Sequence, residues 1–266
     1  MKKQKQLLNF LGKGGAFNSK EGNNCAYIKQ NDMLFLIDCG EDVFSKLVKF
    51  NLLDGIKDIH VYITHLHSDH WGSLSTLLYF AKFVLKIKAT VYTAATELVE
   101  ILGICGNQEE DYSINIMNDG DSISLSSDLY FTQIPVTHSE FLVAKGLYIK
   151  YAEHHIYYSG DSNNVLNEAL DSIDNGLNTQ YYQDTTTYKV PPHLHIEELI
   201  RLTTAEQRKY IYCMHLEGDD LIQIAKSNGF NVVKTISNNE HLFNILQCLS
   251  IGFTILLFMI LFMIYF

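Results

Sequence analysis

Residues 64–70 read Thr64-His-Leu-His-Ser-Asp-His70, and this stretch decides more about the fold than any other part of the chain. Within it, three imidazoles and one carboxylate fall in six consecutive residues, a donor set suited to Zn²⁺, Mn²⁺ or Fe²⁺. These donors are His65, His67, Asp69 and His70. Residues 60–63 before them predict a buried strand, and residues 71–85 after them predict a helix. We therefore expect a metal site on a strand-to-helix loop, where the sites of α/β proteins usually lie.

The bulk composition predicts one globular α/β domain. A chain of 266 residues can bury a full core as a single domain. The net charge is −10, and the arginines are Arg201 and Arg208 alone, so the chain is poorly suited to hold a long nucleic acid by its phosphates. The five cysteines are scattered and form no CxxC pair, which indicates reduced, mostly buried thiols in a cytoplasmic protein.

The C-terminal segment differs from the rest of the chain. Residues 247–266 are twenty residues without a charge, long enough to cross a membrane as a helix and apolar on every face. We predict a globular domain over residues 1–241 and a hydrophobic tail over residues 242–266. The tail would anchor the protein in a membrane with the domain in the cytoplasm. The alternative is a terminal helix buried against the domain.

Strand and helix patterns alternate in two successive halves. Expected strands lie at 7–11, 25–29, 33–38, 60–63, 90–92, 113–117, 122–125, 129–134, 147–151, 155–158, 210–214 and 232–235. Expected helices lie at 43–50, 71–85, 95–105, 163–172, 197–202 and 221–227. Such a repeated alternation predicts two sheets packed face to face with helices outside, a four-layer αββα sandwich of the α/β class.

The order of histidines and aspartates along the chain resembles that of the metallo-β-lactamase fold superfamily. The run H-x-H-x-D-H at 65–70 matches its metal motif, and the resemblance covers about residues 6–236. It implies two divalent metal ions, zinc or alternatively manganese. The first ion would take His65, His67 and His138, the second would take Asp69, His70 and His215, and Asp161 would bridge them. Asp69 would also handle the proton of the attacking water.

Two shorter motifs extend this resemblance. Asp38-Cys-Gly40 is similar to the superfamily's Asp-x-Gly turn, whose aspartate braces the metal-loop histidines. The glycine-rich run at residues 11–17 resembles the first turn of tRNA 3′-processing endonucleases. It lacks the spacing of a phosphate-binding loop, so by itself it indicates a tight turn that needs positive φ.

Segments between Asp161 and His215 resemble the RNase Z-like phosphodiesterase branch. In those enzymes one histidine donates a proton to the leaving oxygen and a carboxylate orients it. The match places the proton donor at His193 and its partner at Asp184. His195 is the alternative donor, and capping of a helix N-terminus is the alternative role for either histidine.

The substrate prediction depends on what surrounds these motifs. Enzymes that process tRNA carry a protruding basic arm. This chain has only a short hairpin, at residues 141–158, between the predicted ligands His138 and Asp161. The chain is similar to compact cyclic-nucleotide phosphodiesterases, including phage anti-Pycsar enzymes that degrade cyclic CMP and cyclic UMP. The resemblance implies a small phosphodiester substrate, no long nucleic acid, a homodimer, and the host cytoplasm if a phage encodes it.

Three alternative functions follow from the same residues. One is a tRNA 3′-processing endonuclease. Another is a β-lactamase or thioester hydrolase, which would share the metal ligands but lack the pair formed by Asp184 and His193. The last is a non-catalytic nucleotide-binding protein, which would tolerate loss of metal ligands, whereas this chain has all seven.

Overall fold

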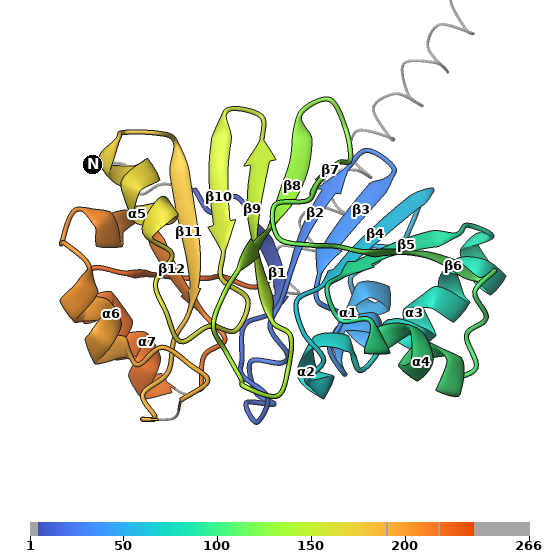
Figure 1. The fold of residues 1–266 in the computed structure, drawn as a ribbon, viewed down its shortest axis with the longest axis horizontal. Coiled ribbons are helices and arrows are strands. Elements are labelled where there is room, and N and C mark those ends of the chain that lie inside the picture. Colours follow the sequence, from blue (N-terminus) through green and yellow to red (C-terminus); the bar gives the residue numbers. More distant parts are fainter. Residues whose placement is uncertain (1–4, 190, 218, 237–266) are drawn as a thin grey trace, which may run out of the picture. The chain divides into compact units, whose positions relative to one another are not determined.

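The computed structural model describes residues 5–189, 191–217 and 219–236, which form two β-sheets packed face to face (Figure 1). The first sheet has the order β1 (Asn9–Gly12), β2 (Cys25–Gln30), β3 (Met33–Ile37), β4 (Asp58–Ile63), β5 (Ala89–Thr93), β6 (Tyr112–Ile116). The second has the order β13 (Asn231–Val232), β12 (Ile211–Met214), β11 (Thr179–Asp184), β10 (His154–Tyr158), β9 (Lys145–Tyr151), β8 (Leu129–Pro135), β7 (Ser122–Ser124). Each sheet combines antiparallel and parallel strands.

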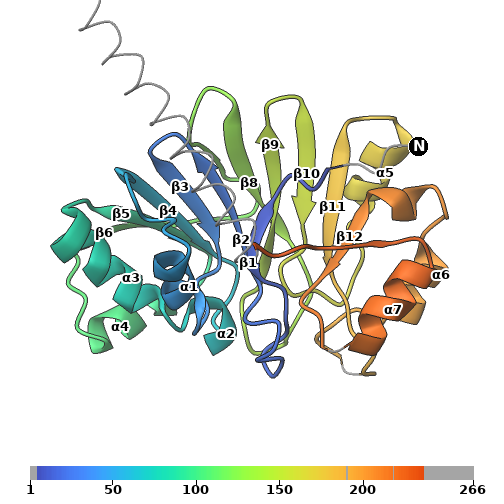
Figure 2. The same ribbon diagram turned by 180° about the vertical axis from the view of Figure 1, so that it is seen from behind.

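Helices cover the outer face of each sheet, as Figures 1 and 2 show from opposite sides. The first sheet carries α1 (Val43–Lys49), α2 (Ser68–Trp71), α3 (Leu74–Phe80) with a π-helical turn (Ala81–Leu85), and α4 (Glu97–Ile104). The second carries α5 (Asn167–Asp174), α6 (Ile196–Leu202), a 3₁₀ turn (Gln207–Tyr210) and α7 (Asp219–Ser227). The predicted four-layer αββα sandwich is confirmed.

Aromatic side chains from the two sheets pack against one another in the core. Phe35 of β3 stacks on Phe131 of β8 with ring centroids 5.1 Å apart, and Tyr62 of β4 meets Phe131 edge-on at 5.7 Å. All three side chains are fully buried. Alternate residues of each strand point into this core, so its apolar surface excludes water from between the sheets.

The chain departs from the predicted elements in three places. The helix expected over residues 71–85 is divided, because α2 begins already at Ser68 and ends at Trp71, and α3 begins at Leu74. Gly72 lies between them, and a Cβ added there would be 2.6 Å from the Ser68 carbonyl oxygen. Residues 163–166 are irregular, so α5 begins later than expected. Strand β11 was not predicted, because its buried Thr and Gln residues break the apolar pattern of an interior strand.

The thiols follow the prediction, whereas the tail is outside the described residues. Cys25, Cys39 and Cys213 are free and buried, and Cys105 is free and exposed. Across the described residues no helix is long and apolar enough to span a membrane. The predicted anchor at 247–266 and the domain boundary at residue 241 lie beyond residue 236 and stay predictions.

Candidate metal centre

The predicted ligands gather at one edge of the sandwich, on loops that follow strand ends. The run His65–His70 follows β4, and the loops after β8, β10 and β12 carry the remaining three ligands. These are His138, Asp161 and His215. The carboxyl ends of parallel strands meet at one sheet edge, which is why residues far apart in sequence converge there. All seven ligand side chains are buried except His67, which is exposed.

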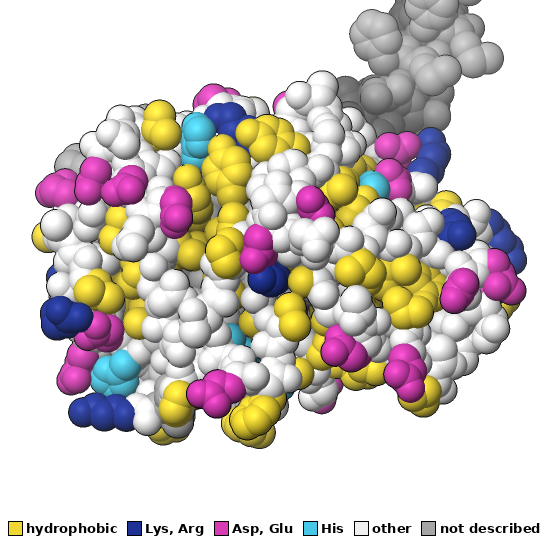
Figure 3. Space-filling model, viewed as in Figure 1, with side chains coloured by type: hydrophobic (Ala, Val, Ile, Leu, Met, Phe, Trp, Pro, Cys, Tyr) yellow, Lys and Arg dark blue, Asp and Glu magenta, His cyan; other side chains and the backbone are white. Residues whose placement is uncertain are grey.

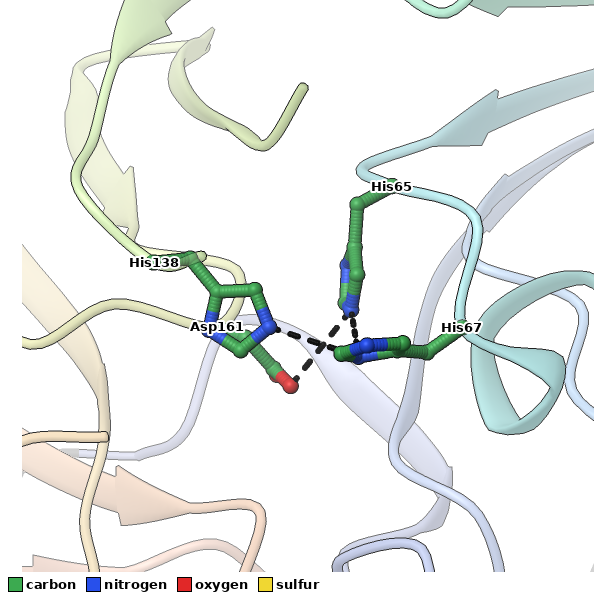
Figure 4. Close-up of side chains that lie close together, drawn as sticks. All are labelled: His65, His67, His138 and Asp161. Atoms are coloured by element: carbon green, nitrogen blue, oxygen red, sulfur yellow. Dashed lines mark hydrogen bonds and ion pairs between the residues drawn. The ribbon is translucent and has the colours of Figure 1, made fainter. Parts of the chain in front are cut away.

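One group of four side chains converges on a common point (Figure 4). His67 Nδ1 lies 3.0 Å from His65 Nε2 and 3.3 Å from His138 Nε2. The fourth donor, Asp161 Oδ2, lies 3.6 Å from His65 Nε2. Ligands about 2.0–2.1 Å from a tetrahedral zinc ion are separated by about 3.3 Å, so these spacings suit such an ion.

A second group shares the Asp161 carboxylate with the first. Asp69 Oδ2 lies 3.3 Å from both His70 Nε2 and His215 Nε2. Asp161 Oδ2 lies 3.4 Å from His70 Nε2 and 3.5 Å from His215 Nε2. The same oxygen therefore faces ligands of both groups, the position expected of a bridging carboxylate.

Atoms in this centre lack the partners that a buried polar group needs. His70 Nε2 and Asp161 Oδ1 are buried and have no hydrogen-bond partner among the described residues. Burial opposes ionisation of Asp161, but His215 and His70 hold the pKa of its carboxyl well below the usual range. The ionised, buried Asp161 carboxylate lies beside an imidazole nitrogen of His70 that has no hydrogen-bond partner. A divalent cation bound between them would satisfy both groups. The residues present therefore fit a metal centre.

Burial and charge also set the protonation of the ligand rings. Burial, aided by the charge of His70, lowers the pKa of His65 well below its ordinary value. Burial and His138 lower the pKa of His67 as well. Neutral imidazole is the form that binds a metal ion, so these two rings are prepared for it.

Contacts behind the ligands fix their orientation. Asp38 Oδ2 accepts a hydrogen bond from His70 Nδ1 at 2.8 Å, and Asp38 Oδ1 accepts one from the Thr64 N–H at 2.9 Å. His138 Nδ1 donates to the Pro192 carbonyl at 2.8 Å. The two contacts made by ring Nδ1 leave Nε2 of His70 and of His138 pointing into the centre, which is the usual role of such outer contacts. Asp38 thus holds the bracing position that the Asp-x-Gly motif predicted.

His193 and Asp184 form a pair beside the second ligand group. His193 Nδ1 donates to Asp184 Oδ2 at 2.7 Å, and Asp184 Oδ2 also accepts from the Ser162 N–H at 3.0 Å. The His193 ring stacks on His215 at 5.1 Å. Burial disfavours the charged ring, but the hydrogen bond and charge of Asp184 raise the pKa of His193 above its ordinary value.

His195 lies apart from this pair. Its Nδ1 accepts from the Glu197 N–H at 3.2 Å and caps α6, while its Nε2 donates to the Thr187 carbonyl at 2.9 Å. Both ring nitrogens are therefore engaged in local structure. Of the two histidines, His193 is the one that faces the metal ligands.

Comparison with known proteins assigns this chain to a family. The sequence profile of the anti-Pycsar protein Apyc1 family matches residues 6–237. The chain belongs to the anti-Pycsar protein Apyc1 family. An anti-Pycsar protein Apyc1 of Bacillus phage vB_BveM-Goe7 is 30% identical over 249 residues, covering 84% of this chain and 93% of the phage protein.

Solved structures support the fold of this Apyc1 family member. The metallo-β-lactamase fold protein YhfI of Bacillus subtilis has a TM-score of 0.66 at 16% identity and covers 86% of this chain and 96% of its own. The short form of human tRNase Z has a TM-score of 0.61 at 15% identity, with 86% and 97% covered. With the histidine and aspartate groups in place, the chain is a metal-dependent hydrolase.

Sequence reasoning missed residues that support the centre of this Apyc1 family member. Thr64 links Asp38 to the metal run, and Gly15 lies against His215, where an added Cβ would be 3.2 Å from the ring. The signal for Thr64 was its position directly before His65. The signal for Gly15 was the Gly14-Gly15 pair, from which the sequence predicted a turn with positive φ. That prediction is wrong, because Gly12, Gly14 and Gly15 all have negative or extended φ, and the limited room beside each one is what excludes a side chain.

Proposed function

We propose that the chain is a dinuclear metal phosphodiesterase that hydrolyses 3′,5′-cyclic nucleotides, with cyclic CMP and cyclic UMP as the first substrates to test. The observation that carries this proposal is the position of Asp161 Oδ2, within 3.4–3.6 Å of Nε2 of His65, His70 and His215. Two ligand groups joined by one carboxylate are the arrangement of a two-metal hydrolase.

The converging side chains support an assignment of ligands to two ions. One ion would be held by His65, His67, His138 and Asp161. The other would be held by Asp69, His70 and His215, with Asp161 shared between the two. When bound, zinc or manganese ions would lower the pKa of water and neutralise charge on the phosphate. Asp69, with one oxygen facing His70 and His215, is the carboxylate placed to accept the proton of the attacking water.

The pair formed by His193 and Asp184 supplies the proton for the leaving group. The Nδ1–H of His193 is used by Asp184, so Nε2 carries the proton that is transferred. Water adds to phosphorus, the bond between phosphorus and one ribose oxygen breaks, and that oxygen takes the proton from His193 Nε2. The product is a nucleoside monophosphate. The His193 side chain is 15% exposed, which leaves the ring accessible to a substrate at the centre.

The surroundings of the centre favour a small substrate over a tRNA. Strands β9 and β10 are joined by a tight turn at Ala152 and Glu153, with no inserted arm in this part of the described chain. On the face in Figure 3, the described Lys and Arg side chains are scattered among acidic ones and form no continuous basic track. Together with the net charge of −10, this disfavours binding along many phosphates.

A substrate panel tests the proposal. Purified protein would be incubated with cyclic CMP, UMP, AMP and GMP, with a 3′-extended tRNA, and with nitrocefin, and the products resolved by chromatography. We expect ring opening of at least one pyrimidine cyclic nucleotide. Cleavage of the tRNA with every cyclic nucleotide untouched would instead support an RNase Z-like endonuclease, the function named for the human structural neighbour.

Two predictions about assembly accompany this function. Residues 247–266 would hold the protein at a membrane, supported by their length and lack of charge. The globular part would form a homodimer in the cytoplasm. Fractionation of the full chain against a variant ending at residue 241 tests the first prediction, and light scattering of the shorter variant tests the second. Equal distribution of both chains in the soluble fraction would contradict the membrane anchor.

A further inference from the structure

The glycine-rich loop between β1 and β2 is bonded to the segment that carries His215. The Gly15 N–H donates to the Leu216 carbonyl at 3.0 Å, and the Leu216 N–H donates to the Lys13 carbonyl at 2.7 Å. The side-chain Nδ2 of Asn18 donates to the same Leu216 carbonyl at 2.8 Å. Three hydrogen bonds therefore tie the loop to the residue that directly follows His215.

His215 needs such support because its backbone is strained. Its φ of +54° lies in the left-handed region, which residues with a Cβ adopt rarely. A conformation of this kind persists at a functional site only when the surrounding structure enforces it. The Asn24 side chain accepts from the His215 N–H at 3.4 Å, and the loop holds Leu216 on the following peptide.

Gly15 also lies directly against the His215 ring. A Cβ added there would lie 3.2 Å from Cε1 and 3.4 Å from Nδ1 of His215, and 3.3 Å from Cγ of Glu217, all inside the usual contact distance of about 3.5–4.0 Å. The opposite ring nitrogen, Nε2, lies 3.3 Å from Asp69 Oδ2. A side chain at position 15 would therefore press on the His215 ring and displace its Nε2 relative to the other donors of the second ligand group.

We propose that the glycine-rich loop is a clamp that positions His215, and that Gly15 is required for the second metal ion to bind at full affinity. This inference rests on the dinuclear centre of the proposed function. Lys13 and Asn18 hold the loop in place, and Gly15 provides the room for the ring. Loss of an outer contact of this type weakens metal binding by roughly 10- to 100-fold.

Zinc titration of the metal-free full chain tests the clamp. Gly15→Ala is compared with the wild type and with Gly103→Ala, a matched control in α4 where an added Cβ meets nothing within 4 Å. We expect Gly15→Ala to bind the first ion normally and the second roughly 10- to 100-fold more weakly. The metal-free melting temperature should stay at the wild-type value, and excess zinc should restore turnover.

Asn18→Asp keeps the test decisive if Gly15→Ala does not fold. It removes the donor to the Leu216 carbonyl at nearly constant size, and we expect the same selective loss of the second ion. Normal affinity for both ions in either folded variant would overturn the clamp, as would equal weakening of both ions with a lower metal-free melting temperature. A wild type that binds fewer than two ions would overturn both proposals, whereas two ions without cyclic-nucleotide turnover would overturn only the substrate.

Discussion

Replacing His193 by alanine tests the proposed chemistry most directly. Asp184 keeps its hydrogen bond from the Ser162 N–H at 3.0 Å and lies 3.5 Å from His215 Nδ1, so truncation of His193 does not leave this buried carboxylate without partners. The variant should therefore fold and bind both metal ions. A positioned general acid contributes about 10²–10⁴-fold, so turnover should fall by about that factor, or about 2.7–5.4 kcal/mol of transition-state free energy.

Asp184→Asn separates the role of the pair from that of each residue. If Asp184 acts through the His193 ring, a variant that combines Asp184→Asn with His193→Ala should turn over substrate no more slowly than His193→Ala alone. The reason is that the two residues work as a unit. The assay is the initial rate of cyclic-nucleotide hydrolysis at saturating metal, with bound metal counted by elemental analysis. Saturating metal matters because Asp184 also lies near His215.

His195→Ala is the matched control for this series. It removes the cap of α6, which should cost about 1 kcal/mol of stability and lower the melting temperature, without changing turnover. Turnover of His193→Ala within about tenfold of the wild type at full metal content would refute His193 as the proton donor. A larger loss in His195→Ala than in His193→Ala would move that role to His195.

Three further outcomes follow from the structure. Asp161→Asn should release both metal ions on dialysis, because its Oδ2 faces both ligand groups; elemental analysis showing two retained ions would contradict the bridge. Phe35→Ala should lower the free energy of unfolding in urea by about 3–5 kcal/mol, whereas Phe17→Ala, which is 99% exposed, should change it by no more than about 0.5 kcal/mol; equal losses would contradict the described core. Burial raises the pKa of Cys39 to about 12, so at pH 8 iodoacetamide should label Cys105 in the folded protein and spare Cys39; equally rapid labelling of both would show that Cys39 is accessible.

Much of the candidate metal centre was predictable, because four of its side chains lie within six consecutive residues. His65, His67, Asp69 and His70 follow one another so closely that any turn after β4 keeps them together. The prediction placed all four on a loop, whereas Asp69 and His70 lie in α2. That helix packs so closely on the Asp-x-Gly turn that a Cβ at Gly40 would overlap the Asp69 carbonyl.

The less regular parts of the fold were harder to predict. Strand β11 escaped prediction because its polar residues are buried by neighbouring strands, and Gln180 takes its hydrogen-bond partner from the distant N-terminal segment, where the Lys5 carbonyl accepts from its Nε2. Its end carries Asp184, so the sequence singled out the carboxylate that pairs with His193 without identifying the strand that places it.

By itself, the sequence predicted the αββα class and singled out the histidines and aspartates that converge in the structure, since these predictions depend on residue type and on spacing along the chain. Only the tertiary structure brought Asp184 against His193 and turned His195 to the start of α6, and only it placed Gly15 against His215. Two histidines separated by a single residue look alike in sequence. They differ in space because His195 begins α6 and turns its ring to the helix N-terminus, while His193 lies in the preceding loop, where Asp184 at the end of a parallel strand can reach it.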